Sequence, residues 1–130
     1  MKTVSVITAR GGSKGIPRKN ILPIKGRPLI WYTINASKNS NVDETWVSTD
    51  DVEIAEVSQK YGAKVLWRPA ELANDSIMPD ASLVHFAENI DFSTLVFIQP
   101  TSPLLDYNHI NSGLAMMSKY DSIFKDIAEI

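Results

Sequence analysis

Basic residues and glycines are concentrated near the start of the chain, in a pattern suited to binding phosphate. Seven of the 13 lysines and arginines lie in the first 27 positions, and the first acidic residue is Asp43. The sequence ARGGSKGIPRKN mixes Arg10, Lys14 and Lys19 with glycines. Glycine lets the backbone approach a phosphate closely and turn its N–H groups inward, while the cations neutralise the charge. The segment therefore predicts a polyphosphate-binding loop.

Two common phosphate motifs do not fit this segment. The Walker pattern needs a Gly-Lys-Ser/Thr ending, which the sequence lacks. The dinucleotide pattern needs glycines that open a helix at once, whereas Ile16-Pro17 prolongs the loop. Nucleic acid is a poor candidate partner, because no aromatic residue interleaves with these charges until Trp31. Composition alone leaves open a solvated basic loop.

The elements that must position this loop follow an alternating pattern. The β-branched run Thr3–Ala9 predicts a buried parallel strand, and a long loop follows it from Arg10 to Arg27. Further strands are expected at Thr45–Thr49, Ala63–Trp67, Leu95–Gln99 and Asp121–Phe124. Helices are expected after Pro28, after Asp50 (with Glu53 in a capping box), after Asp80, and over Asp106–Tyr120. The alternation predicts an α/β fold with a parallel sheet, whose ligands bind outside the carboxyl ends of the strands.

Helical spacing also predicts which side chains face the core. For the first two helices these are Leu29, Ile30, Thr33, Ile34, Ser37, Ile54, Ala55, Ser58 and Tyr61, with Gly62 ending the second helix. The third helix carries Leu83, Val84 and Ala87, and Trp31, Trp46 and Trp67 are interpreted as core residues.

Bulk composition indicates one soluble domain. The chain has 130 residues, 44% hydrophobic and 22% charged, with a net charge of −2. It contains no cysteine, which excludes a disulfide framework and a thiolate metal site. There is no secretory signal pattern and no apolar run near the roughly 18 residues of a membrane span, so a cytoplasmic location is expected.

The basic loop resembles the signature loop of the acylneuraminate cytidylyltransferases. The likeness continues in order through STDD (Ser48–Asp51), YGA (Tyr61–Ala63), RPAELAND (Arg68–Asp75) and QPTSPL (Gln99–Leu104). This resemblance implies a Rossmann-like nucleotidyltransferase fold. It also implies transfer of CMP from CTP to a sialic-acid-like nonulosonic acid, with release of pyrophosphate and with Mg²⁺ neutralising charge.

The resemblance also implies roles for individual residues. The nucleotide is expected to be held by Arg10, Gly11, Gly12, Ser13, Lys14, Lys19, Asn20 and Arg68. Arg10 and Lys19 are expected to face the triphosphate as the catalytic cations, and Gln99 to lie against the sugar acid. Arg68 has an alternative interpretation as a loop brace that pairs with Glu71 or Asp75.

Other chemically active residues favour structural roles. Capping of the following helix explains Asp50 better than a metal site shared with Asp51, and the metal ligands stay unassigned. His85 and His109 are interpreted as hydrogen-bonded structural histidines. Ser13 has no His/Asp arrangement nearby in sequence, so nucleophilic serine catalysis has no support.

Alternatives remain within and beyond the family. A cytidylyltransferase for the eight-carbon acid KDO ranks second, because Gly11-Gly12 and Arg18-Lys19-Asn20 match the sialic-type loop better. Ser76–Asp80 departs from the better-known sialic enzymes, which leaves the sugar preference open. Family members usually continue beyond this length, so we expect a fold incomplete at its C-terminus. Two hypotheses follow: the nucleotide-binding half of the enzyme, expected to form a homodimer, or a binding module without turnover.

Overall fold

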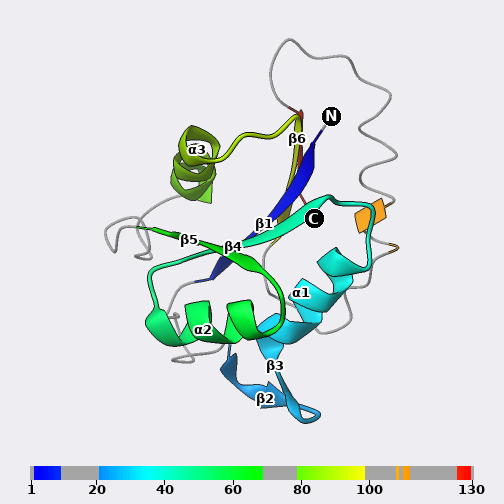
Figure 1. Ribbon diagram of the computed structural model, residues 1–130, viewed down its shortest axis with the longest axis vertical. Helices are drawn as coiled ribbons and strands as arrows, with labels where there is room; N and C mark the ends of the chain where they lie inside the picture. Colours follow the sequence, from blue (N-terminus) through cyan, green and yellow to red (C-terminus); the bar gives the residue numbers. More distant parts are fainter. Residues whose placement is uncertain are drawn as a thin grey trace.

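The structure is a computed structural model of the chain and describes residues 2–9, 21–68, 79–98, 108, 110–111 and 126–129. Residues 79–83 and 126–129 are described through their backbone alone. Apart from a short unpredicted hairpin at residues 23–28, helices and strands alternate along the chain up to residue 98, as the sequence predicts, and Figure 1 shows their arrangement.

A five-stranded parallel sheet forms the centre of the described fold. Its strands lie in the order β5-β4-β1-β6-β7. Their bounds are β1 Thr3–Ala9, β4 Glu44–Thr49, β5 Lys64–Trp67, β6 Thr94–Ile98 and β7 Asp126–Glu129. The predicted strand Thr3–Ala9 is therefore confirmed at both ends, and the next three predicted strands are confirmed to within one residue.

Helices cover both faces of the sheet. Helices α1 (Leu29–Lys38) and α2 (Val52–Lys60) pack on one face, with Ile34 and Ile54 against Ile7 in a buried apolar cluster. Helix α3 (Pro79–Asn89) packs on the other face, where Phe86 joins a second cluster. Neighbouring β1 residues contribute to opposite clusters, because side chains alternate across a strand. The predicted doubly covered sheet is confirmed.

Helix α1 begins after Pro28 and ends at Asn39, close to both predicted boundaries. Proline suits the start of a helix because its fixed φ and missing N–H cost nothing there. All five residues predicted to face inward on this helix are buried. The buried Ser37 of this helix shares hydrogen bonds with Ser5 (2.6 Å) and Thr45 (2.7 Å), which tie α1 to β1 and β4.

Helix α2 is capped by Asp51, not by Asp50 as the sequence analysis expected. The Asp51 Oδ1 atom accepts a hydrogen bond from the Ile54 backbone N–H at 2.9 Å. The expectation failed by one residue because the spacing to Glu53 favoured Asp50, whereas Glu53 is only the second residue of the helix and the N–H of Ile54 faces Asp51. Gly62 ends α2 with a φ of +91°, a left-handed conformation that favours glycine, so the predicted stop is confirmed.

Two predictions about apolar side chains are wrong. Val84 is 55% exposed, and among the α3 side chains that the structure describes, Phe86 is the fully buried one. The predicted Leu83 side chain lies outside the described residues. Trp67 is 52% exposed, because it ends β5, which lies at one edge of the described sheet. Trp46 and Trp31 are partly buried, and Trp46 packs edge-on against Phe86 with ring centroids 5.9 Å apart.

The last predicted elements are tested only in part. Residues 108, 110 and 111 are helical, within the predicted helix Asp106–Tyr120, and Ile110 is buried. The predicted strand Asp121–Phe124 lies outside the described residues. A strand does follow at Asp126–Glu129 and pairs with β6, so the sheet extends through residues that showed no strand signal.

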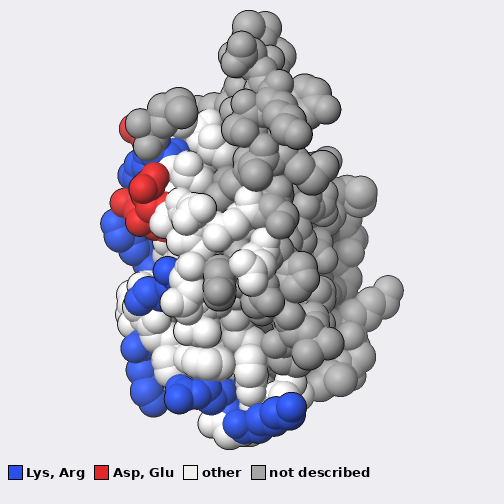
Figure 2. Space-filling view, turned by 90° about the vertical axis from the view of Figure 1, so that its right-hand side faces the viewer, with Lys and Arg blue, Asp and Glu red and all other residues white. Residues whose placement is uncertain are grey.

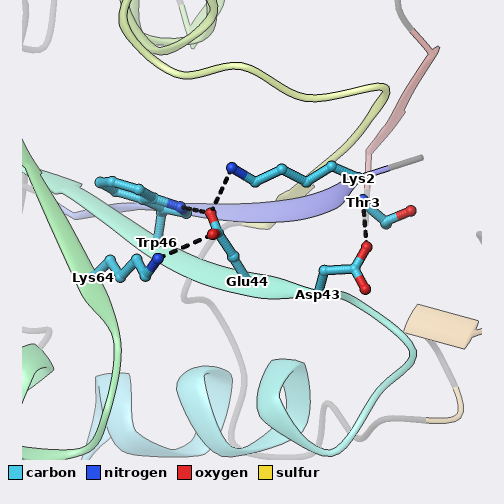
Figure 3. Close-up of polar contacts among 6 residues, drawn as sticks. All are labelled: Lys2, Thr3, Asp43, Glu44, Trp46 and Lys64. Carbon is cyan, nitrogen blue, oxygen red and sulfur yellow. Dashed lines mark hydrogen bonds and ion pairs between the residues drawn. The ribbon is translucent and has the colours of Figure 1, made fainter.

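A polar network crosses β1, β4 and β5 near the amino ends of these strands. The Glu44 carboxylate accepts hydrogen bonds from Trp46 Nε1 and Lys64 Nζ, both at 2.9 Å, and pairs with Lys2 Nζ at 3.2 Å. Figure 3 shows the three donors converging on this one carboxylate. The hydrogen bond from Trp46 lowers the pKa of Glu44 most, followed by that from Lys64, and together with Lys2 they bring it to about 2. The network therefore ties together three strands opposite their carboxyl ends.

None of the helices in the described part of the chain is both long and apolar enough to cross a lipid bilayer.

Candidate functional site

The carboxyl ends of four strands meet at one edge of the sheet. Ala9 of β1 pairs with Thr49 of β4, which pairs with Trp67 of β5, and Ile7 of β1 pairs with Ile98 of β6. Four of the five motifs noted in the sequence begin directly after, or at the end of, one of these strands: residues 9–20, 48–51, 68–75 and 99–104. The fifth, Tyr61–Ala63, lies between α2 and the start of β5. Motifs far apart in the chain therefore start from a common edge.

The strand order identifies where along this edge a ligand would bind. From β1 the chain runs outward to β4 and β5, and then crosses to β6 on the other side of β1. Connections after β1 and β6 therefore leave in opposite directions, which opens a crevice at the switch point of parallel sheets. The two motifs that follow these strands are the basic loop and the segment beginning with Gln99.

Most of the predicted site residues lie outside the described part of the chain. These are Arg10, Gly11, Gly12, Ser13, Lys14, Lys19, Asn20 and Gln99. Their roles stay predictions. Arg68 is described, and the structure places it directly after β5 at the carboxyl edge.

Arg68 is a buried cation, only 6% exposed. Its backbone N–H donates to the Thr49 carbonyl at 3.0 Å, so the chain continues the pairing of β5 with β4 for one residue beyond the strand. Burying a guanidinium is unfavourable unless it has charged or polar partners. A solvated surface role is therefore excluded for Arg68, whereas both the nucleotide contact and the loop brace require such partners.

Of the two aspartates after β4, Asp51 has a structural role at the start of α2. Asp51 uses one carboxylate oxygen to cap α2, and its N–H donates to Thr49 Oγ1 at 3.1 Å. Within the described ranges, no group of three or more His, Cys, Asp or Glu side chains could hold a metal ion. The predicted cap is therefore present, with Asp51 in place of Asp50.

A hairpin that the sequence analysis missed joins the basic loop to α1. Strands β2 (Pro23–Ile24) and β3 (Arg27–Pro28) pair antiparallel, and Leu29 N–H donates to the Leu22 carbonyl at 3.0 Å. The Tyr32 hydroxyl donates to the Ile24 carbonyl. The available signal was Lys25-Gly26, a turn dipeptide between two short extended pairs, but two prolines in so short a segment favoured a plain loop.

Exposed cations also mark this hairpin. Figure 2 shows lysine and arginine side chains gathered at the lower end of one face, the end where Figure 1 places β2 and β3. Lys25 and Arg27 of the hairpin are both exposed. The Arg27 guanidinium lies over the Trp31 ring, 4.4 Å from its centroid, so it also holds the hairpin against α1.

Ser48 and His85 each carry a buried polar atom that has no hydrogen-bond partner among the described residues. Ser48 Oγ lies near the carboxyl end of β4 and is fully buried. His85 Nδ1 on α3 is likewise without a partner in the described ranges, so the prediction of a hydrogen-bonded histidine is wrong for that nitrogen. His109 lies outside the described residues.

Comparisons with known proteins agree with this geometry. The sequence pattern of the family described as cytidylyltransferase matches residues 4–127. N-acylneuraminate cytidylyltransferase A of Danio rerio is 42% identical over 124 residues, which is 92% of this chain and 29% of that protein. The pseudaminic acid cytidylyltransferase of Campylobacter jejuni is 41% identical over 131 residues, which is 95% of this chain and 56% of that protein.

Solved structures show the same fold. A CMP:2-keto-3-deoxy-manno-octonic acid synthetase complexed with CTP superimposes with a TM-score of 0.82 at 28% identity, covering 92% of this chain and 48% of that one. A cytidylyltransferase from Leptospira borgpetersenii gives a TM-score of 0.77 at 23% identity, covering 94% and 51%, and this likeness shows the fold alone.

The chain spans between 29% and 56% of the length of these two curated relatives and about half of the two solved structures. Its parallel sheet, the motifs at its carboxyl edge and the match over residues 4–127 agree with one another. The chain belongs to the cytidylyltransferase family, and the relatives compared here are acylneuraminate and pseudaminic acid members of it.

Proposed function

We propose that this chain carries the nucleotide-binding part of an enzyme that transfers CMP from CTP to a sialic-acid-like nonulosonic acid. The observation that carries the proposal is the 41–42% identity to relatives named for such sugar acids. Support comes from the sheet edge, where four motifs follow the carboxyl ends of β1, β4, β5 and β6.

The proposed nucleotide contacts come mainly from the segment after β1. They are Arg10, Gly11, Gly12, Ser13, Lys14, Lys19, Asn20 and, from the end of β5, Arg68. Arg10 and Lys19 would face the triphosphate, and Gln99 would contact the sugar acid. The burial of Arg68 supports its part, because a buried guanidinium is preorganised for charge-assisted hydrogen bonds.

The reaction is a single displacement at the α-phosphorus of CTP. The anomeric hydroxyl oxygen forms the new P–O bond and loses its proton, while the bond to the bridging oxygen breaks and pyrophosphate leaves. Negative charge grows on the leaving group, so fixed cations at its position lower the barrier more than a covalent nucleophile would. Arg10 and Lys19 are proposed to supply that stabilisation.

Magnesium is part of the proposal, although the described residues supply no cluster that would hold it alone. Mg²⁺ often enters such sites with the substrate, bound by phosphate oxygens, water and one or two carboxylates. When bound, it would neutralise charge on the triphosphate.

The test is pyrophosphate release. The chain is incubated with CTP, Mg²⁺ and, separately, N-acetylneuraminic acid, pseudaminic acid or KDO, and CTP binding is titrated in parallel. We expect CTP binding, and pyrophosphate with a nonulosonic acid. CTP binding without pyrophosphate for any acid would identify a binding module without turnover. Folded protein that binds no CTP would contradict the proposal altogether.

A KDO cytidylyltransferase remains the second candidate, favoured by the TM-score of 0.82 with the octonic acid synthetase. Sequence identity favours the nonulosonic acids, at 42% against 28%. Faster pyrophosphate release with KDO would reverse this order. A homodimer and a cytoplasmic location also stay predictions, and sedimentation of the purified chain would test the first.

A further inference from the structure

The segment that carries the predicted phosphate loop is anchored at both ends by described structure. At one end Ala9, 1% exposed, is paired with Thr49 inside the sheet. At the other end Ile21 packs against the core cluster beneath α1. Ala9 is fixed by the central strand of the sheet. Ile21 lies outside the sheet and is followed directly by the β2–β3 hairpin, so the hairpin helps to set the position of Ile21.

Three contacts fix the hairpin against α1. Leu29 N–H donates to the Leu22 carbonyl at 3.0 Å and closes the base of the hairpin. The Arg27 guanidinium stacks over Trp31 at 4.4 Å. The Tyr32 hydroxyl donates to the Ile24 carbonyl, one residue before the turn. Tyr32 thus links a side chain of α1 to the backbone of the hairpin through a hydrogen bond.

The turn itself is in a conformation that needs such support. Lys25 has a φ of +51° and Gly26 a φ of +84°, the geometry of a two-residue turn with both central residues left-handed. Lysine is disfavoured there, because its Cβ crowds the neighbouring carbonyl. Strained residues of this kind persist where surrounding contacts over-determine them. The contacts to Tyr32 and Trp31 are of that sort.

We propose that Tyr32 is a positioning residue for the triphosphate of the nucleotide. Through the Ile24 carbonyl it fixes the hairpin, and the hairpin fixes the point at which the cation-bearing segment rejoins the fold. The inference rests on the proposed function, since it requires that this segment binds the phosphates. Small displacements of phosphate ligands weaken binding without any change in their chemistry.

The test compares CTP with CMP in Tyr32→Phe, which removes the hydroxyl and keeps the ring. We expect the Kd for CTP to rise about three- to tenfold, the range for one lost hydrogen bond. The Kd for CMP should rise less, because CMP lacks the β- and γ-phosphates. Tyr61→Phe is the matched control: Tyr61 follows α2 at the opposite edge, and both Kd values should keep their wild-type ratio.

A second pair of variants tests the turn. Gly26→Ala places a side chain at a positive φ and should lower the CTP to CMP preference as Tyr32→Phe does. Lys25→Gly relieves the neighbouring strain without removing an anchor and should retain that preference. An unchanged ratio of the CTP and CMP Kd values in Tyr32→Phe would overturn the inference, whether both nucleotides bind equally less tightly or neither affinity changes. Wild-type protein that binds no CTP would remove the proposed function itself, and this inference with it.

Discussion

At the scale of single residues, Arg68 separates the two interpretations of the sequence. It is buried at the carboxyl edge, where either a nucleotide or the following loop would be its partner. If Arg68 contacts the nucleotide, Arg68→Gln should reduce the binding free energy of CTP by about 1.5–3 kcal/mol, the contribution of a hydrogen bond to a charged group. A loop brace predicts instead a lower urea midpoint with unchanged CTP affinity. Isothermal titration and urea unfolding of the same preparation distinguish the two.

Glu44 makes a prediction about pH. Its pKa falls from 4.5 to about 2 in the folded chain, so folding favours the ionised carboxylate. The stabilisation is complete above pH 4.5 and is lost as the pH falls toward 2. Glu44→Gln should lower the unfolding free energy at pH 7 by about 1 kcal/mol, because Lys2 and Lys64 are half-exposed and screened.

The difference between Glu44→Gln and wild type should therefore shrink when urea unfolding is repeated at pH 3. Glu56→Gln, an exposed change on α2, serves as the control for loss of one negative charge. A difference that stays constant between pH 7 and pH 3 would show that the carboxylate charge contributes nothing through this network.

At the scale of elements, the start of α2 tests the cap assignment. Asp51→Ala should destabilise the chain by about 1 kcal/mol, because the N–H of Ile54 loses its acceptor. Asp51→Asn keeps an oxygen at the same place and should cost much less. Thermal unfolding of both variants checks the order. Equal losses would mean that the negative charge matters more than the hydrogen bond.

The elements predicted well were those whose apolar pattern is long and local. The run Thr3–Ala9 and the inward positions of α1 were predictable because burial dictates both periodicities. The β2–β3 hairpin and the strand Asp126–Glu129 were not, since they depend on partners distant from the local sequence. Val84 failed for a related reason: only the packing of α3 on Trp46 and Phe92 selects Phe86 as its inner residue.

At the scale of the whole molecule, the sequence predicted a parallel sheet but not its order. Alternating strands and helices require crossovers, yet periodicity does not say on which side of β1 the strand β6 inserts. That insertion creates the switch point between β1 and β6. The family resemblance predicts residues for binding there, and the topology explains why segments separated by some ninety positions start from one edge.

The same topology predicts how ligand binding should affect the entire fold. A nucleotide held as proposed, by segments after β1, β5 and β6, would link three strands of one sheet, so its binding energy would add to global stability. At a CTP concentration about 100 times its Kd, the gain is roughly 2.7 kcal/mol, or a rise in Tm of about 10 °C for a chain of this size. Differential scanning fluorimetry measures it, with ATP at equal concentration as the control. An equal rise with ATP would indicate a site that recognises polyphosphate alone, because only contacts to the cytosine distinguish the two nucleotides.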